Sequence, residues 1–67
     1  MLLVGREDIK KVFVEVGMGT TECARISGMS HVTIRNVLAR QPVLPATAKK
    51  FCNTIGKTIW ECFELVE

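Results

Sequence analysis

Apolar residues recur along this chain at the spacing that places them on one face of a helix. In residues 6–16 they follow the order i, i+3, i+4, i+7, which predicts an amphipathic helix. A Gly-Met-Gly segment at residues 17–19 follows, and glycine tolerates the left-handed conformation in which many helices end. The inward-facing residues of this helix are expected to be Ile9, Val12, Phe13 and Val16.

Two shorter helices are predicted in residues 20–39. Thr20 or Thr21 can cap the first, and Gly28 is expected to stop it. Ser30 can cap the next helix, which runs to about position 40. Only a tight turn separates the two. The residues suited to hold these helices together are Cys23, Met29, Ile34 and Val37, with the small Ala24 where they approach most closely.

Two further helices are predicted after a connector. Residues 41–45 contain two prolines, which exclude a continuous helix, and Pro45 suits the first turn of a fourth helix. Gly56 closes that helix, and Thr58 can cap a short fifth one. The apolar residues expected to face inward from these two helices are Ala48, Phe51, Cys52, Ile55, Ile59, Cys62, Phe63 and Val66.

The expected fold is therefore all-α, with five short helices around one core in a single domain over residues 1–67. The chain ends, residues 2–4 and 65–67, can add a small terminal strand pair. A chain of 67 residues with 48% hydrophobic content is enough for one small core. No apolar run has the length of a membrane span or of a signal-peptide core, so we expect a cytoplasmic, nucleoid-associated protein.

Charge is distributed unevenly along the chain. The formal net charge is only +2, but no Asp or Glu lies between Cys23 and Trp60. Six basic residues lie there: Arg25, Arg35, Arg40, Lys49, Lys50 and Lys57. A solvated surface normally mixes both signs, so this segregation favours a polyanionic partner.

Two helices joined by a glycine turn are typical of a helix-turn-helix, which lays its second helix in the major groove of DNA. The chain resembles the Cro/CI-like (XRE-type) family of phage and bacterial regulators over about residues 6–63. The family's Leu-Ala-x-x-Ala-Gly-Val-Ser segment corresponds to Cys-Ala-Arg-Ile-Ser-Gly-Met-Ser at residues 23–30, and its Thr-Ile-x-x-apolar segment to residues 33–37. Cys23 stands where the family has leucine, and Thr20 where it has a phosphate-bracing glutamine. The resemblance implies a five-helix, lambda-repressor-like DNA-binding fold and a transcriptional regulator.

The predicted third helix carries the candidate base-reading residues. Its inward face is formed by Ile34, Val37 and Leu38, and Val32 lies about 200° around the helix from Ile34. Asparagine can pair with adenine, arginine with guanine or a phosphate, and a valine methyl with thymine. A histidine near the helix start can reach a base or the backbone. The expected base contacts are His31, Val32, Arg35 and Asn36; an ordinary solvated helix face is the alternative.

Phosphate contacts are expected at helix starts and at basic residues. Hydroxyls and free N–H groups at a helix N-terminus attract phosphate, and the resemblance places further contacts just beyond the third helix. Lysines and Arg25 can equally be solvated side chains. The candidates are Thr20, Thr21, Ser30, Arg40, Gln41 and Lys50.

These observations predict a sequence-specific regulator that binds double-stranded DNA, as a homodimer on a palindrome with half-sites about 34 Å apart. A protein-interaction module of accessory or antitoxin-like type on the same fold, and a non-specific architectural DNA binder, remain as alternatives. An enzyme is not expected: Gly17-x-Gly19 lacks the third glycine of a nucleotide fingerprint. Three cysteines without a metal-ligand pattern predict no cofactor or metal. Trp60 lies off its helix's apolar stripe, at the core or core edge or in a dimer contact.

Overall fold

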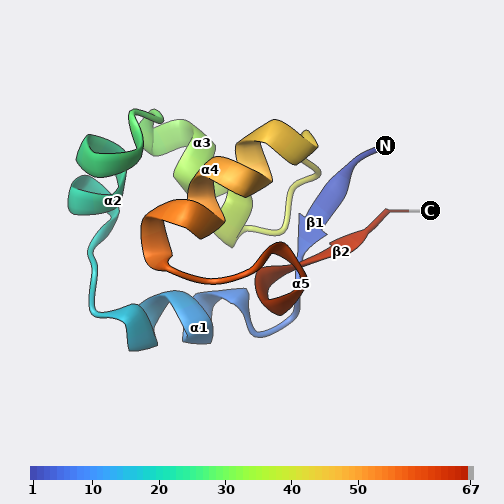
Figure 1. Cartoon of the computed structure of the whole chain (residues 1–67), viewed down its shortest axis with the longest axis horizontal. Coiled ribbons are helices and arrows are strands. Elements are labelled where there is room, and N and C mark those ends of the chain that lie inside the picture. Colours follow the sequence, from blue (N-terminus) through green and yellow to red (C-terminus); the bar gives the residue numbers. More distant parts are fainter. Residues whose placement is uncertain (67) are drawn as a thin grey trace.

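Glycines in the left-handed conformation end three of the five helices. In the computed structural model, which describes residues 1–66, Gly17, Gly28 and Gly56 have φ of 80°, 76° and 74° and terminate the first, second and fourth helices. The helices are α1 (Ile9–Val16), α2 (Thr20–Ser27), α3 (His31–Leu38), α4 (Pro45–Ile55) and α5 (Ile59–Cys62). The expectation of five short helices is confirmed (Figure 1).

The starts of α1 and α2 differ from the sequence prediction. Helix α1 begins at Ile9 rather than at position 6: the Arg6 N–H donates to the Cys62 carbonyl at 2.8 Å, and residues 7 and 8 form a turn before the helix. Helix α2 is capped by Gly19, whose extended backbone leads into the helix. Thr20 and Thr21 are therefore its first two residues and not its cap. Both threonines lie in the first turn, where backbone N–H groups lack partners within the helix.

A short antiparallel sheet joins the two ends of the chain. Strand β1 (Leu3–Gly5) pairs with β2 (Phe63–Leu65) in the register Leu3 to Leu65. The terminal strand pair is thus confirmed, shifted from residues 2–4 and 65–67; Glu67 lies outside the described residues. Helix α5 has only four residues because Phe63 adopts an extended backbone and enters β2.

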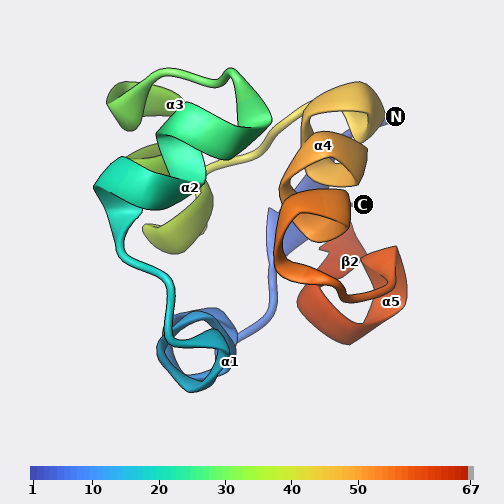
Figure 2. The same cartoon turned by 60° about the vertical axis from the view of Figure 1, so that its left-hand side comes forward.

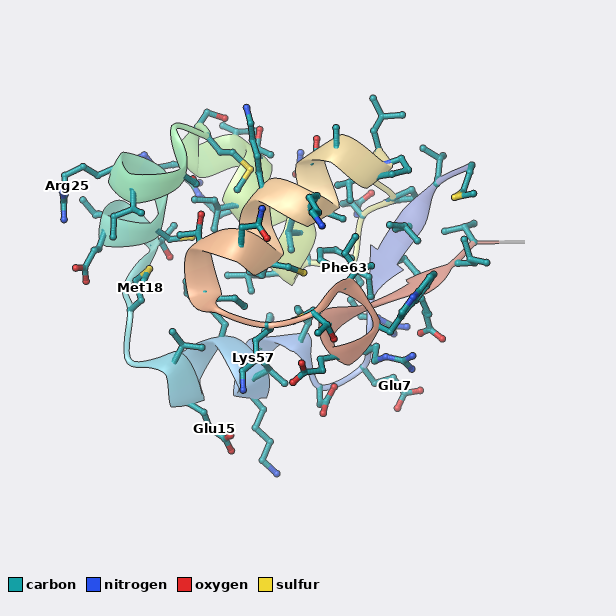
Figure 3. The ribbon with its side chains drawn as sticks, in the orientation of Figure 1. Glu7, Glu15, Met18, Arg25, Lys57 and Phe63 are labelled. Atoms are coloured by element: carbon teal, nitrogen blue, oxygen red, sulfur yellow. The ribbon has the colours of Figure 1, made fainter. Side chains whose placement is uncertain are left out.

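Among residues 1–66 the buried side chains are all apolar. Phe13 stacks on Phe51 with 5.7 Å between ring centroids, and Phe63 meets Phe51 edge-on at 6.0 Å. The side chain of Phe63 points from β2 into the domain (Figure 3). Val66 is exposed, which corrects the expectation that it faces inward. The buried residues are Leu3, Ile9, Phe13, Cys23, Ala24, Ile34, Val37, Ala48, Phe51, Cys52, Ile55, Cys62 and Phe63.

The elements place α2 and α3 together on one side of the domain and the terminal sheet at one end (Figures 1 and 2). Helix α2 contacts both α3 and α4, while α1 lies along the opposite side. The domain measures 31 × 20 × 18 Å. None of the helices in residues 1–66 is long and apolar enough to cross a membrane.

Candidate nucleic-acid interface

The connection between α2 and α3 is fixed by local hydrogen bonds. The Gly28 N–H donates to the Ala24 carbonyl at 2.9 Å, which closes α2. The Met29 N–H donates to the Ser27 hydroxyl oxygen at 3.1 Å. The Ser30 hydroxyl oxygen then accepts from the Thr33 N–H at 3.1 Å, so Ser30 caps α3 as predicted. These contacts set the relative orientation of α2 and α3 within a three-residue turn.

Helix α3 has one buried and one exposed face. Ile34 and Val37 have no exposed surface, and Leu38 is half-buried. Val32 is 61% exposed. A single exposed valine is common on protein surfaces, so its meaning depends on the polar residues beside it. All four predicted base-reading residues are exposed on this helix: His31, Val32, Arg35 and Asn36.

The start of α3 meets the start of α2. The His31 Nε2 atom lies 3.4 Å from the Thr21 hydroxyl oxygen. The structure therefore brings together His31, predicted as a base contact, and Thr21, predicted as a backbone contact. Thr20 is instead half-buried and lines a groove against α1, so only Thr21 of the two threonines is exposed beside α3.

The two neighbouring lysines of α4 line different surfaces. Lys50 borders a crevice of about 200 Å³ shared with the α2–α3 turn and the first turn of α4. Lys49 borders a separate crevice near α5. Thr33 and Thr47 line the Lys50 crevice and were missed by sequence reasoning. Thr47 could have been found, because it lies in the first turn of the helix that starts at Pro45.

Arg40 has a structural role that the sequence did not reveal. Its Nε donates to the Gly5 carbonyl at 2.8 Å, and its Nη2 lies 3.5 Å from the Glu64 carboxylate. The side chain is thus directed to the terminal sheet, which weakens the case for a phosphate contact. Gln41 is exposed, and its backbone N–H closes α3 by donating to the Asn36 carbonyl at 2.9 Å.

Charge is less segregated in space than along the sequence. Glu22 lies in the first turn of α2 and its carboxylate is 3.7 Å from the Arg25 guanidinium. Glu7 and Glu15 lie on the α1 side of the domain, away from Arg25 on α2 (Figure 3). Helix α3 itself contains no acidic residue. Acidic residues nevertheless lie beside both ends of this helix pair: Glu22 at the start of α2 and Glu64 next to Arg40 beyond α3.

A second surface feature is an apolar groove of about 530 Å³ between α1, the start of α2 and the end of α3. Its apolar walls include Val14, which is 74% exposed. Lys10 contributes the charged part of the rim. The side chains that line it are Lys10, Phe13, Val14, Met18, Thr20 and Leu38.

Comparisons of the chain with protein-family models, with curated proteins and with solved structures found no match.

Proposed function

We propose that the chain is a sequence-specific DNA-binding transcriptional regulator with a lambda-repressor-like fold. In this proposal α2 and α3 form a helix-turn-helix, and α3 lies in the major groove. Base edges are read by His31, Val32, Arg35 and Asn36, and the backbone is held by residues around Thr21 and Lys50. Major-groove binding by the second helix of such a pair is a general way to read base sequence.

The observation that carries the proposal is the division of α3 into two faces. Ile34 and Val37 are completely buried, so the helix is fixed in rotation about its axis. The opposite face combines an exposed methyl surface at Val32 with the amide of Asn36 and the guanidinium of Arg35. Thymine methyls, adenine edges and guanine edges are the groups that such side chains recognise.

The surroundings of α3 support contact with a polyanion. Lys50, Thr33 and Thr47 meet in one crevice beside the α2–α3 turn. Hydroxyl and ammonium groups that converge in this way can hold one backbone phosphate. The Thr21 hydroxyl lies at the other end of this surface, next to His31.

Selection of bound sequences from a random duplex pool, followed by salt titration, tests the proposal. A regulator should enrich one motif and bind it about 10³-fold or more tightly than random duplex, with affinity falling steeply as salt increases. Equal binding to selected and random duplexes would instead support an architectural DNA binder. Absence of binding to any duplex at low salt would exclude both DNA-binding functions.

The apolar groove favours a second candidate, a protein-interaction module of accessory or antitoxin-like type. Val14 and the neighbouring Met18 and Leu38 give this groove the character of a site for an apolar partner segment. In this case Val14→Lys should abolish partner binding and Asn36→Ala should have no effect. If Asn36→Ala instead weakens duplex binding and Val14→Lys leaves it unchanged, the result would support the DNA-binding proposal.

A further inference from the structure

The outer edge of β2 has backbone groups directed away from the sheet. The Val66 N–H donates to the Leu2 carbonyl at 3.0 Å, and the Arg6 N–H donates to the Cys62 carbonyl at 2.8 Å. In an antiparallel ladder alternate residues face the neighbouring strand. Leu65 lies between the residues that face β1, so its N–H and C=O point to the opposite side.

The pairing of β1 confirms this alternation. Leu3 lies opposite Leu65, and its own N–H and C=O bond to Val43 at 2.8 and 2.7 Å, on the side away from β2. Val43 therefore covers the outer edge of β1. Within residues 1–66 the sheet has two strands only, and no strand covers the outer edge of β2.

Apolar side chains surround this uncovered edge. Leu65 is 47% exposed and Val66 41%, although both follow the fully buried Phe63. Leu2, opposite Val66, is also exposed, and Trp60 is exposed in the helix that leads into β2. Edge strands in monomers are usually protected by short length, by charged residues such as lysine, by proline or by a bulge. Residues 63–66 contain no lysine or proline, and the Glu64 carboxylate is paired with Arg40 of the same chain, so short length is the protection that β2 retains.

We propose that this edge binds a second copy of the chain, with β2 of each copy antiparallel around a two-fold axis at Leu65. One residue then supplies both a donor and an acceptor, and the two Leu65 backbones exchange two N–H···O=C bonds. This arrangement extends the two strands to a four-stranded sheet. It is self-complementary, as a two-fold interface requires.

The position of the Glu64 charge is consistent with a two-fold axis at Leu65. Glu64 is the acidic residue of β2, and its carboxylate lies 3.5 Å from the Arg40 guanidinium of the same chain. With the axis at Leu65, Glu64 lies opposite Val66 of the second copy. Moving the axis by one residue to Glu64, which shifts the pairing by two residues, would place the two Glu64 side chains opposite each other, and like charges facing across a ladder are destabilising.

The interface is small, so the dimer should be weak. A stable dimer buries about 800 Å² per partner, which is about a fifth of this chain's 4201 Å² surface. A three-residue strand with four neighbouring apolar side chains supplies less. We therefore expect a concentration-dependent equilibrium between monomer and dimer.

Sedimentation equilibrium without DNA tests the proposal independently of the proposed function. Between about 10 µM and about 1 mM, where small interfaces associate, the mass should rise from 7.5 kDa towards twice that value. Leu65→Lys should remain monomeric. Leu44→Lys is the matched control, because Leu44 is 62% exposed but follows Val43 beyond the other edge of β1. A wild-type chain that stays monomeric throughout would overturn the proposal.

Cross-linking gives a positive test of the register. Directly opposed residues in a hydrogen-bonded pair have Cα atoms about 5.5 Å apart, within the range of a disulfide. Leu65→Cys should therefore form a covalent dimer with oxidised glutathione as the oxidant, since the three native cysteines are buried. Leu44→Cys should not. Equal cross-linking of the two variants, or none in either, would contradict the proposed axis.

Discussion

Arg40 at the end of α3 is joined to Gly5 in β1 by a hydrogen bond of 2.8 Å from Nε to the carbonyl oxygen. The two residues are 35 positions apart in the sequence. Arg40 lies two residues beyond the end of α3 and has a left-handed backbone, with φ of 61°, and its side chain is directed to the terminal sheet. This contact links the proposed recognition helix to the sheet at the chain ends.

Two substitutions of Arg40 should distinguish the stability contributed by its side-chain hydrogen bond from the cost of its left-handed backbone. Arg40→Ala should lower the free energy of unfolding by about 1–2 kcal/mol, because the bond to Gly5 is lost. Arg40→Gly should lose less, since glycine avoids a cost of about 1 kcal/mol in the left-handed conformation. Urea denaturation measures both. A glycine variant no more stable than the alanine variant would contradict the strain argument.

Gly28 should be required for its backbone conformation alone. Its φ is 76°, and a Cβ added there would meet no heavy atom of the described residues within 4 Å. Gly28→Ala should therefore cost about 1–2 kcal/mol through strain and not through a clash. Gly28→Asn should cost less, because asparagine tolerates this conformation better. Thermal or urea unfolding of the two variants checks the order; equal losses would point to a clash or a lost contact.

The parts of the fold that could be predicted from the sequence are those set by neighbouring residues. Gly28, Ser30 and Pro45 act within one helix turn of their own position, and each was assigned correctly as a helix stop, cap or first residue. The exposed and buried faces of α3 follow from helical geometry and the apolar positions. They could be read from sequence for the same reason.

The parts that could not be predicted depend on contacts between distant residues. Arg40 was predicted as a contact to the DNA backbone, and the sequence gives no sign of its bonds to Gly5 and Glu64 near the two ends of the chain. Phe63 continues the apolar spacing of a helix, yet pairing with β1 makes it a strand residue. Sequence spacing also gave no structural reason to separate Lys49 from Lys50, which are consecutive in α4 but line different crevices.

Stability should decrease in acid partly through Glu61. Hydrogen bonds from the Thr58 N–H and hydroxyl, both 3.0 Å to Oε1, lower the pKa of the Glu61 carboxyl below its ordinary value of 4.5. A lowered pKa in the folded state stabilises the fold above the ordinary pKa, and this contribution is lost as pH falls through the folded-state value. Glu61→Gln retains an acceptor but cannot titrate. Its unfolding free energy should fall less than that of wild type between about pH 5 and about pH 3, and identical pH profiles would contradict this role.

Lys50 and Lys49 form a matched pair for testing the backbone contact. Under the proposed function, Lys50→Ala should weaken binding to specific and random duplexes to the same extent. The slope of log K against log salt should decrease by about 1, as expected for one lost phosphate contact. Lys49→Ala removes an equal charge from the other side of α4 and should change the slope less. Equal effects of the two variants would indicate general charge attraction without a defined site at the Lys50 crevice.

Asn36 gives the sharpest test of base reading, because its side chain is exposed on the face of α3 opposite the buried Ile34 and Val37. On the selected site, Asn36→Ala should cost about 1–3 kcal/mol, the range for one bidentate pair with adenine. The preference at one base pair should disappear while the salt slope stays unchanged. Asn53→Ala, an exposed asparagine of α4 beside Lys49, is the control and should bind like wild type. Titrations against the selected duplex and its single-base variants measure both effects, and an unchanged base preference in Asn36→Ala would show that this face of α3 does not read sequence.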